Sequence, residues 1–288
     1  MVREFFVRPI RDVIACLEQV AESPTPRRSL LVMLVSLIAA WFVYVPIHEL
    51  LHVAGCVVTG GAISQLEIAP QYGGTLLARM FPFVVSGGEY AGRLSGFDVK
   101  GSDLIYLATD FMPFALSVVL GVPLIQFCAR RRSAVLFGVS CVLGLAPFYN
   151  IFGDYYEMGS ILVTRGLAEA ADQTVEFPAI ESPTVKETGD AVEPVAGQVV
   201  HGVKSRNDPA SSGIVWSRLR GDDVFKRIAS VYSDSSEFGI KSSFDILVST
   251  CVVLISFGVG IILAFATYSL GGLFVALLGP SVSIRQAR

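Results

Sequence analysis

The apolar residues of this chain are concentrated in four long uncharged blocks. They cover residues 30–47, 111–129, 133–153 and 246–284, which are 18, 19, 21 and 39 residues long. A helix that crosses a bilayer needs about 20 predominantly apolar residues. The pattern therefore predicts helical spans at about 29–59, 103–129 and 133–167, followed by a C-terminal span at 243–280 and a tail at 281–288.

Two of these blocks carry signals for a break. The third block is interrupted by APFYNIFGDYYEMGS, in which Pro147 disrupts helical hydrogen bonding. In the last block, Gly271 and Gly272 mark the position at which a spanning helix ends and a shorter interfacial piece begins. The alternative for this block is one continuous helix.

Polar and mixed segments lie between the blocks. Residues 60–102 hold short β-type runs separated by paired glycines, which predict a hairpin or small sheet at the membrane surface. Residues 1–28 place arginines among apolar side chains, which indicates an amphipathic juxtamembrane segment with Phe5, Phe6, Ile10 and Ile14 facing the lipid. A partly ordered tail is the alternative.

Residues 168–242 are predicted to be an acidic, polar segment outside the membrane. Residues 169–193 hold seven acidic side chains and one lysine, a composition typical of extended or disordered chain. Further along, Val224, Ile228 and Val231 recur at helical spacing and predict a short amphipathic helix.

Composition supports the same class of protein. Hydrophobic residues make up 52% of the chain and charged residues 16%, and the mean hydropathy is +0.60. An ordinary soluble domain has about 25% charged residues. We therefore expect an all-α polytopic protein of the cell membrane, with a three-span core, a C-terminal span, and a small β element between the first two spans.

The net charge and the spacing of the cysteines argue against a nucleic-acid partner and against a disulfide or CxxC site. The net charge is −3, and no basic stretch is interleaved with aromatic residues, so nucleic acid is not expected as a partner. The five cysteines are odd in number, and their spacing forms neither a disulfide framework nor a CxxC site.

The motif PIHELLH, at residues 46–52, carries the clearest chemistry. Residues four apart lie on one face of a helix, so His48 and His52 can reach one metal ion. Glu49 can then act as general base towards a water that zinc acidifies, as in HExxH metalloproteases. The competing interpretation is that these residues only cap the span, but a charge at the centre of a membrane helix costs about 2.5–3.5 kcal/mol.

A catalytic zinc ion needs a third protein ligand. Asp154 and Glu157 are the carboxylates of the break in the third span, and such breaks persist where they line protein or water. His48 lies 20 residues after Arg28, and Asp154 lies 22 residues after Arg132. At about 1.5 Å per residue, parallel first and third spans bring Asp154 to the depth of the histidines.

The chain has HELLH in an early span and, two spans later, a carboxylate after a break that contains Pro and Asn. In this arrangement it resembles the site-2 protease family of intramembrane zinc metalloproteases. The resemblance covers about residues 29–167. It implies an aspartate as third ligand, but the order departs from the family's N-x-x-P…D-G pattern because Pro147 precedes Asn150 and Tyr155 follows Asp154. Aligning EMGSIL with the family's D-G-G-x-I-L gives Glu157 as the alternative ligand.

The resemblance also carries expectations for residues outside the ligand set. It implies that Asn150 orients substrate, although Asn150 can equally cap the restarted helix. It implies a β element beside the active site, where residues 61–90 supply an edge for an extended substrate. The alternative is a surface hairpin without substrate contact.

Two further side chains are candidates near the motif. Cys56 follows His52 by one helical turn and is either a fourth ligand or a small apolar residue. Asp110 either orients a ligand histidine or marks the start of the second span.

The sequence therefore predicts a zinc endopeptidase that cleaves membrane-spanning or membrane-proximal protein or peptide substrates. Two alternatives belong to other classes. One is a proteolytically inactive scaffold or metal-binding regulator on the same core. The other is a metal or ion transporter, against which four spans without an inverted repeat argue.

Overall fold

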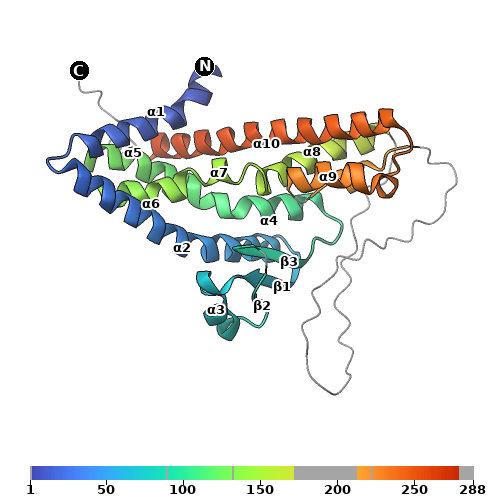
Figure 1. Cartoon of the computed structure of the whole chain (residues 1–288), viewed down its shortest axis with the longest axis horizontal. Coiled ribbons are helices and arrows are strands. Elements are labelled where there is room, and N and C mark those ends of the chain that lie inside the picture. Colours follow the sequence, from blue (N-terminus) through green and yellow to red (C-terminus); the bar gives the residue numbers. More distant parts are fainter. Residues whose placement is uncertain (1, 89, 132, 172–212, 222, 279–288) are drawn as a thin grey trace.

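The computed structural model describes residues 2–88, 90–131, 133–171, 213–221 and 223–278, and it is mostly helical (Figure 1). The α-helices are α1 Val2–Ala21, α2 Pro26–Val58, α3 Gly74–Met80, α4 Asp103–Leu116, α5 Val122–Arg131, α6 Ala134–Gly144, α7 Ala146–Tyr149, α8 Asp154–Ala170, α9 Val224–Ser233 and α10 Ser243–Leu277. The short turns are η1 Pro70–Tyr72, η2 Ser117–Gly121, η3 Trp216–Leu219 and η4 Ser235–Phe238, and the strands are β1 Ala62–Ile68, β2 Val84–Ser86 and β3 Gly92–Asp98.

In the part of the chain that the structure describes, three helical stretches are long and apolar enough to cross a membrane. They are Pro26–Val58, Asp103–Cys128 and Ser243–Leu277. The second of these runs from α4 through the π-helical turn η2 into α5. The last is one continuous helix, so of the two alternatives for this block the unbroken helix is confirmed and the break at Gly271 and Gly272 is excluded. These glycines instead allow close contact with Val122 and Arg8.

The third predicted span is divided into three helices. α6 is apolar but only 11 residues long, α7 is a single turn, and α8 begins at Asp154. Figure 1 shows these helices following one another along the bundle, with α6 beside α2 and α8 beside α10. The break at residues 150–153 therefore lies within the bundle, at the position that the sequence predicted.

The predicted small sheet is present between α2 and α4. β1 is the central strand; it pairs in parallel with β2 and antiparallel with β3. Its apolar residues Leu66 and Ile68 are buried with Val84, and they pack on Val53 of α2. The sheet therefore lies against the half of α2 that carries the HELLH motif (Figure 1).

The residues between β1 and β2 differ from the prediction of β-type runs, because residues 74–80 form α3. Gly73 has φ +84°, a left-handed conformation that starts the helix at no steric cost. Leu77 and Ala78 then pack against the sheet, whereas Leu76 and Met80 are exposed. Helical periodicity in this short stretch outweighs its β propensity.

The segment predicted to be polar and outside the membrane is not uniform. Residues 172–212, which include most of the acidic run and His201, lie outside the described residues. Residues 213–221 and 223–242 fold onto the bundle. Their core consists of Ile214, Leu219, Val231, Phe238 and Ile240, with Val252 of α10. The predicted amphipathic helix is α9, with Val224 and Val231 buried.

The N-terminal segment is a regular amphipathic helix rather than a partly ordered tail over its described residues. Cys16 and Val20 of α1 are buried in a core shared with α5 and α6. Phe6, Ile10 and Ile14 are exposed, as expected for side chains that face lipid. Phe5 and Phe6 also contact Phe265 of α10, with ring centroids 5.9 and 4.9 Å from its ring.

Candidate metal centre

His48 and His52 lie on successive turns of α2 and point to the same place. Their ring centroids are 4.7 Å apart, and their Nε2 atoms are 3.1 Å apart. The four-residue spacing in the sequence produces this arrangement because 3.6 residues complete one turn of a helix.

Asp154 joins the two histidines from the other side of the bundle. It is the first residue of α8, directly after the break. Its Oδ2 lies 3.1 Å from Nε2 of His48 and 3.7 Å from Nε2 of His52. Among the described residues, these three side chains form the group whose ligand atoms lie within 4.8 Å of one another.

The spacing of these three atoms fits one metal ion. Ligand atoms about 2.0–2.1 Å from a tetrahedral zinc ion lie about 3.3 Å from one another. The three distances in the group are 3.1, 3.1 and 3.7 Å. Two imidazole nitrogens and a carboxylate oxygen are also donors that zinc accepts, with a fourth position left for water.

The second nitrogen of each imidazole is held by a neighbour. Nδ1 of His52 lies 2.8 Å from the backbone oxygen of Thr109 in α4, and a carbonyl can only accept. His52 therefore donates from Nδ1, and its Nε2 presents a lone pair to the shared point. Nδ1 of His48 lies 2.8 Å from the hydroxyl of Tyr44. Contacts of this kind fix the orientation of metal-binding histidines.

Close helix packing places these groups. A Cβ added at Gly55 would lie 2.6 Å from the oxygen of Ala108, so α2 and α4 approach backbone to backbone beside Thr109. A Cβ added at Gly159 would lie 2.2 Å from the oxygen of Ser256, so α8 is equally close to α10. Small residues at both contacts bring Thr109 and Asp154 within reach of α2.

Glu49 is turned from the metal ligands towards the sheet. The side chains of His48, Glu49 and His52 are all buried, with 6%, 9% and 7% exposure. A Cβ added at Gly92, the first residue of β3, would lie 2.3 Å from Cγ of Glu49 and 2.9 Å from its Oε1. Strand β3 thus forms the wall against which the candidate general base rests.

Gly92→Ala is expected to displace Glu49 without removing the metal ligands. The added methyl group cannot share space with the carboxylate, and a misplacement of about 1 Å can cost about 100-fold in rate. We expect metal content to stay unchanged and, if the centre cleaves peptides as the sequence predicts, cleavage to fall about 10- to 100-fold. Gly166→Ala is the matched control, because nothing lies within 4 Å of its added Cβ. Equal cleavage by the two variants would contradict this placement of Glu49.

Glu157, the alternative third ligand, lies elsewhere. It is one helical turn after Asp154, and its Oε2 accepts a hydrogen bond from the Tyr106 hydroxyl at 3.0 Å. Asn150 organises the break itself: its side-chain amide donates to the oxygen of Ala146, and its backbone oxygen accepts from the amide of Tyr155. Asn150 thus caps the C-terminal end of α7. The restarted helix α8 has Gly153 at its N-cap and no side-chain cap, so the alternative that Asn150 caps α8 is wrong.

Cys56 and Asp110 are both buried near the centre but outside the ligand group. Sγ of Cys56 lies 3.8 Å from the oxygen of Ala62, beyond the end of α2. Oδ2 of Asp110 has no hydrogen-bond partner among the described residues. The carbonyl of its neighbour Thr109 orients His52. Helix α4 begins at Asp103, so the alternative that Asp110 marks the start of the second span is wrong.

Three neighbours of the site were not identified from the sequence. Tyr44 precedes His48 by four residues, so helical spacing was a usable signal for it. The roles of Thr109 and Gly92 depend on a backbone carbonyl and on the absence of a side chain, which no motif records.

Comparison of the chain with known proteins gives no match to a family model, to a curated protein or to a solved structure. The functional interpretation therefore depends on the geometry of the centre and on the chemistry of its donors.

Proposed function

We propose that this chain is a membrane-embedded zinc endopeptidase that resembles the site-2 proteases. The observation that carries the proposal is the convergence of three donor atoms from α2 and α8, with both imidazoles oriented by Tyr44 and Thr109. A structural role for two histidines would not require their Nε2 atoms to face each other and a carboxylate. Glu49, adjacent in sequence, supplies the base that peptide hydrolysis needs.

The proposed chemistry divides between the ion and the protein. Zinc, when bound, acidifies a water and polarises the carbonyl of the scissile peptide. Glu49 accepts the proton of the attacking water and delivers it to the departing amine nitrogen. Asp154 offsets part of the charge of the ion, and the burial of the centre strengthens each of these electrostatic interactions.

The membrane setting follows from the three apolar helical stretches. We propose that α2, the α4–α5 stretch and α10 cross the bilayer, with the α6–α8 stretch enclosed among them. Irregular backbone at membrane depth is tolerated only where it is buried in protein or faces water. At the break, Ile151 and Gly153 are half-buried, and the ring of Phe152, although 46% exposed, stacks on Phe257 of α10 with centroids 5.3 Å apart.

The proposed substrate is a membrane-spanning or membrane-proximal peptide segment bound in extended form. A strand added to an exposed sheet edge is held by main-chain hydrogen bonds, largely regardless of its side chains. β3 is an edge strand of the described sheet, and it begins at Gly92 against Glu49. An extended peptide along this edge would pass beside the general base.

Removal of the metal is expected to stop cleavage reversibly. Detergent-purified protein treated with a chelator should lose zinc and peptidase activity in parallel, and added zinc should restore both, because the ion polarises the peptide and acidifies the water. A helical circular dichroism spectrum that does not change would show that the fold persists. Full activity after complete zinc removal would contradict the proposal.

One observation favours a second candidate, a metal-binding regulator without peptidase activity. The three side chains of the HELLH motif are at most 9% exposed, so the centre is closed to a peptide in this conformation. The two candidates differ in cleavage and not in metal content, so a cleavage assay separates them.

A further inference from the structure

Helix α9 lies against the break that carries Asp154. The backbone amide of Val224, its first residue, donates to the oxygen of Phe152 at 3.2 Å. The ring of Phe225 stacks on the ring of Phe152, with centroids 5.3 Å apart and an interplanar angle of 24°. Phe152 precedes Asp154 by two residues, so this end of α9 is docked directly beside the metal centre.

The same helix also reaches the strand that contacts Glu49. Nζ of Lys226 lies 4.4 Å from the centroid of the Tyr90 ring. Tyr90 precedes Gly92 by two residues, and Gly92 touches the side chain of Glu49. Lys226 thus connects two segments that flank the metal centre. One is the sheet beside Glu49, and the other, through α9, is the break beside Asp154.

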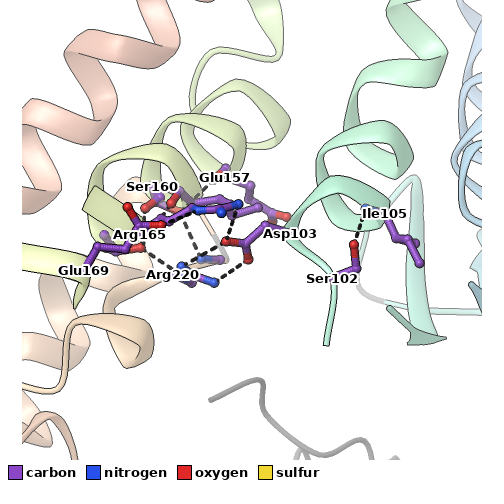
Figure 2. A network of polar contacts seen from close by, with 11 residues as sticks. Ser102, Asp103, Ile105, Glu157, Ser160, Arg165, Glu169 and Arg220 are labelled. Carbon is purple, nitrogen blue, oxygen red and sulfur yellow. Dashed lines mark hydrogen bonds and ion pairs between the residues drawn. The ribbon is translucent and has the colours of Figure 1, made fainter. Parts of the chain in front are cut away.

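A buried ion pair anchors the chain just before α9. Figure 2 shows Arg220 between the start of α4 and the side of α8. Its guanidinium donates to Asp103 at 2.7 and 3.4 Å and to Oγ1 of Thr164 at 2.8 Å, and the side chains of the pair are 9% and 6% exposed. The amide of Gly221 donates to Oγ of Ser160 at 3.2 Å.

The Arg220–Asp103 ion pair and the Lys226–Tyr90 contact differ in strength. Breaking the Arg220–Asp103 pair would leave a buried charge without its partner, which is strongly unfavourable. The Lys226–Tyr90 contact is exposed, and such cation–π contacts are weak. Between them, Gly221 has φ +73°, a backbone conformation that glycine adopts freely. The side-chain contacts that hold the first turn of α9 towards the sheet are therefore weak. The middle of α9 is held firmly, because Val231 is buried and Arg227 donates to the backbone oxygens of Arg220 and Gly221.

We propose that the first turn of α9 is a lid on the metal centre. Phe225 and Lys226 separate from Phe152 and Tyr90 to admit an extended peptide between the sheet and the break. The rest of α9 stays on the bundle, held by Arg227 and Val231. This role in peptide entry rests on the proposed function. The motion itself does not, because it follows from the contacts of α9 whatever reaction the centre performs.

Hydrogen–deuterium exchange on the detergent-purified full chain tests the motion. Lys226→Met keeps the length of the side chain and removes its charge, and Tyr90→Leu removes the ring. Each is expected to speed exchange about twofold to fivefold in peptides covering residues 86–94 and 150–157, the effect of losing an exposed cation–π contact. Peptides from α6 are the internal control and should not change.

Unchanged exchange at residues 86–94 and 150–157 in both variants would overturn the proposal. A uniform increase that includes α6 would also overturn it, because it would indicate general destabilisation rather than opening of α9. Neither readout needs bound metal or peptidase activity, so the lid is tested even if the proposed function fails.

A reversible cross-link then tests peptide entry. In a background with the exposed Cys251 replaced by serine, Tyr90→Cys and Lys226→Cys are joined by a short bifunctional thiol reagent that forms reducible disulfides. The locked protein is expected to keep its zinc, to lose cleavage by about tenfold or more, and to recover after reduction. The Lys226→Cys single variant, treated in the same way, is the control. Cleavage at the wild-type rate by fully locked protein would overturn the role in entry.

Discussion

Glu49→Gln is expected to abolish peptide cleavage while zinc stays bound. Glutamine has nearly the same shape, so the contact with Gly92 and the positions of His48 and His52 should persist. It cannot accept a proton from water, and loss of a general base typically costs about 10²–10⁴ in rate. Turnover of a membrane-protein substrate in detergent or vesicles, measured beside zinc content, gives both quantities.

The control for this variant is Glu169→Gln, which makes the same chemical change at an exposed position where Glu169 pairs with Arg165. It is expected to cleave at the wild-type rate. Cleavage by Glu49→Gln at a similar rate would exclude Glu49 as the base. Loss of zinc from Glu49→Gln would instead assign Glu49 to the binding of the ion.

Asp154→Asn is expected to release the metal. The amide retains one oxygen near the histidines but loses the negative charge that offsets the charge of the ion. Partners that only orient a metal ligand cost about 10- to 100-fold in affinity when they are removed, so the loss of a ligand itself should exceed about 100-fold. Zinc affinity, measured by competition with a chelator of known strength, is the readout.

Glu157→Gln is the matched control for Asp154, since it lies one turn away on the same helix. Its carboxylate bonds to Tyr106 and not to the histidines. It should therefore keep its zinc, with any effect confined to local stability. The reverse pattern, with zinc lost from Glu157→Gln and kept by Asp154→Asn, would show that α8 presents Glu157 to the ion.

The sequence predicted the parts of the site that depend on helical periodicity. The spacing of His48 and His52 determines that they share a face of α2, and Pro147 predicts a break before α8. The depth argument selected Asp154 as the partner of the histidines, and its Oδ2 lies next to both Nε2 atoms. These inferences hold because a helix converts a count of residues into a direction and a distance.

The parts that depend on contacts between distant segments could not be predicted. The closeness of Gly92 to Glu49 results from the packing of the sheet on α2. The amphipathic pattern of α9 predicted a helix, but its placement beside Phe152 and Tyr90 depends on tertiary contacts of single side chains. The continuity of α10 through Gly271 depends on close packing against Val122, which outweighs the low helix propensity of glycine.

The zinc content of the full chain, purified in detergent and measured by elemental analysis, is the most direct test of the metal centre. We predict about one zinc ion per chain in the wild-type protein and none above background in His48→Ala, whose missing imidazole leaves two of the three donors. A wild-type protein without stoichiometric metal after exposure to zinc, or a His48→Ala variant that retains the same amount, would contradict the assignment of His48, His52 and Asp154 as metal ligands.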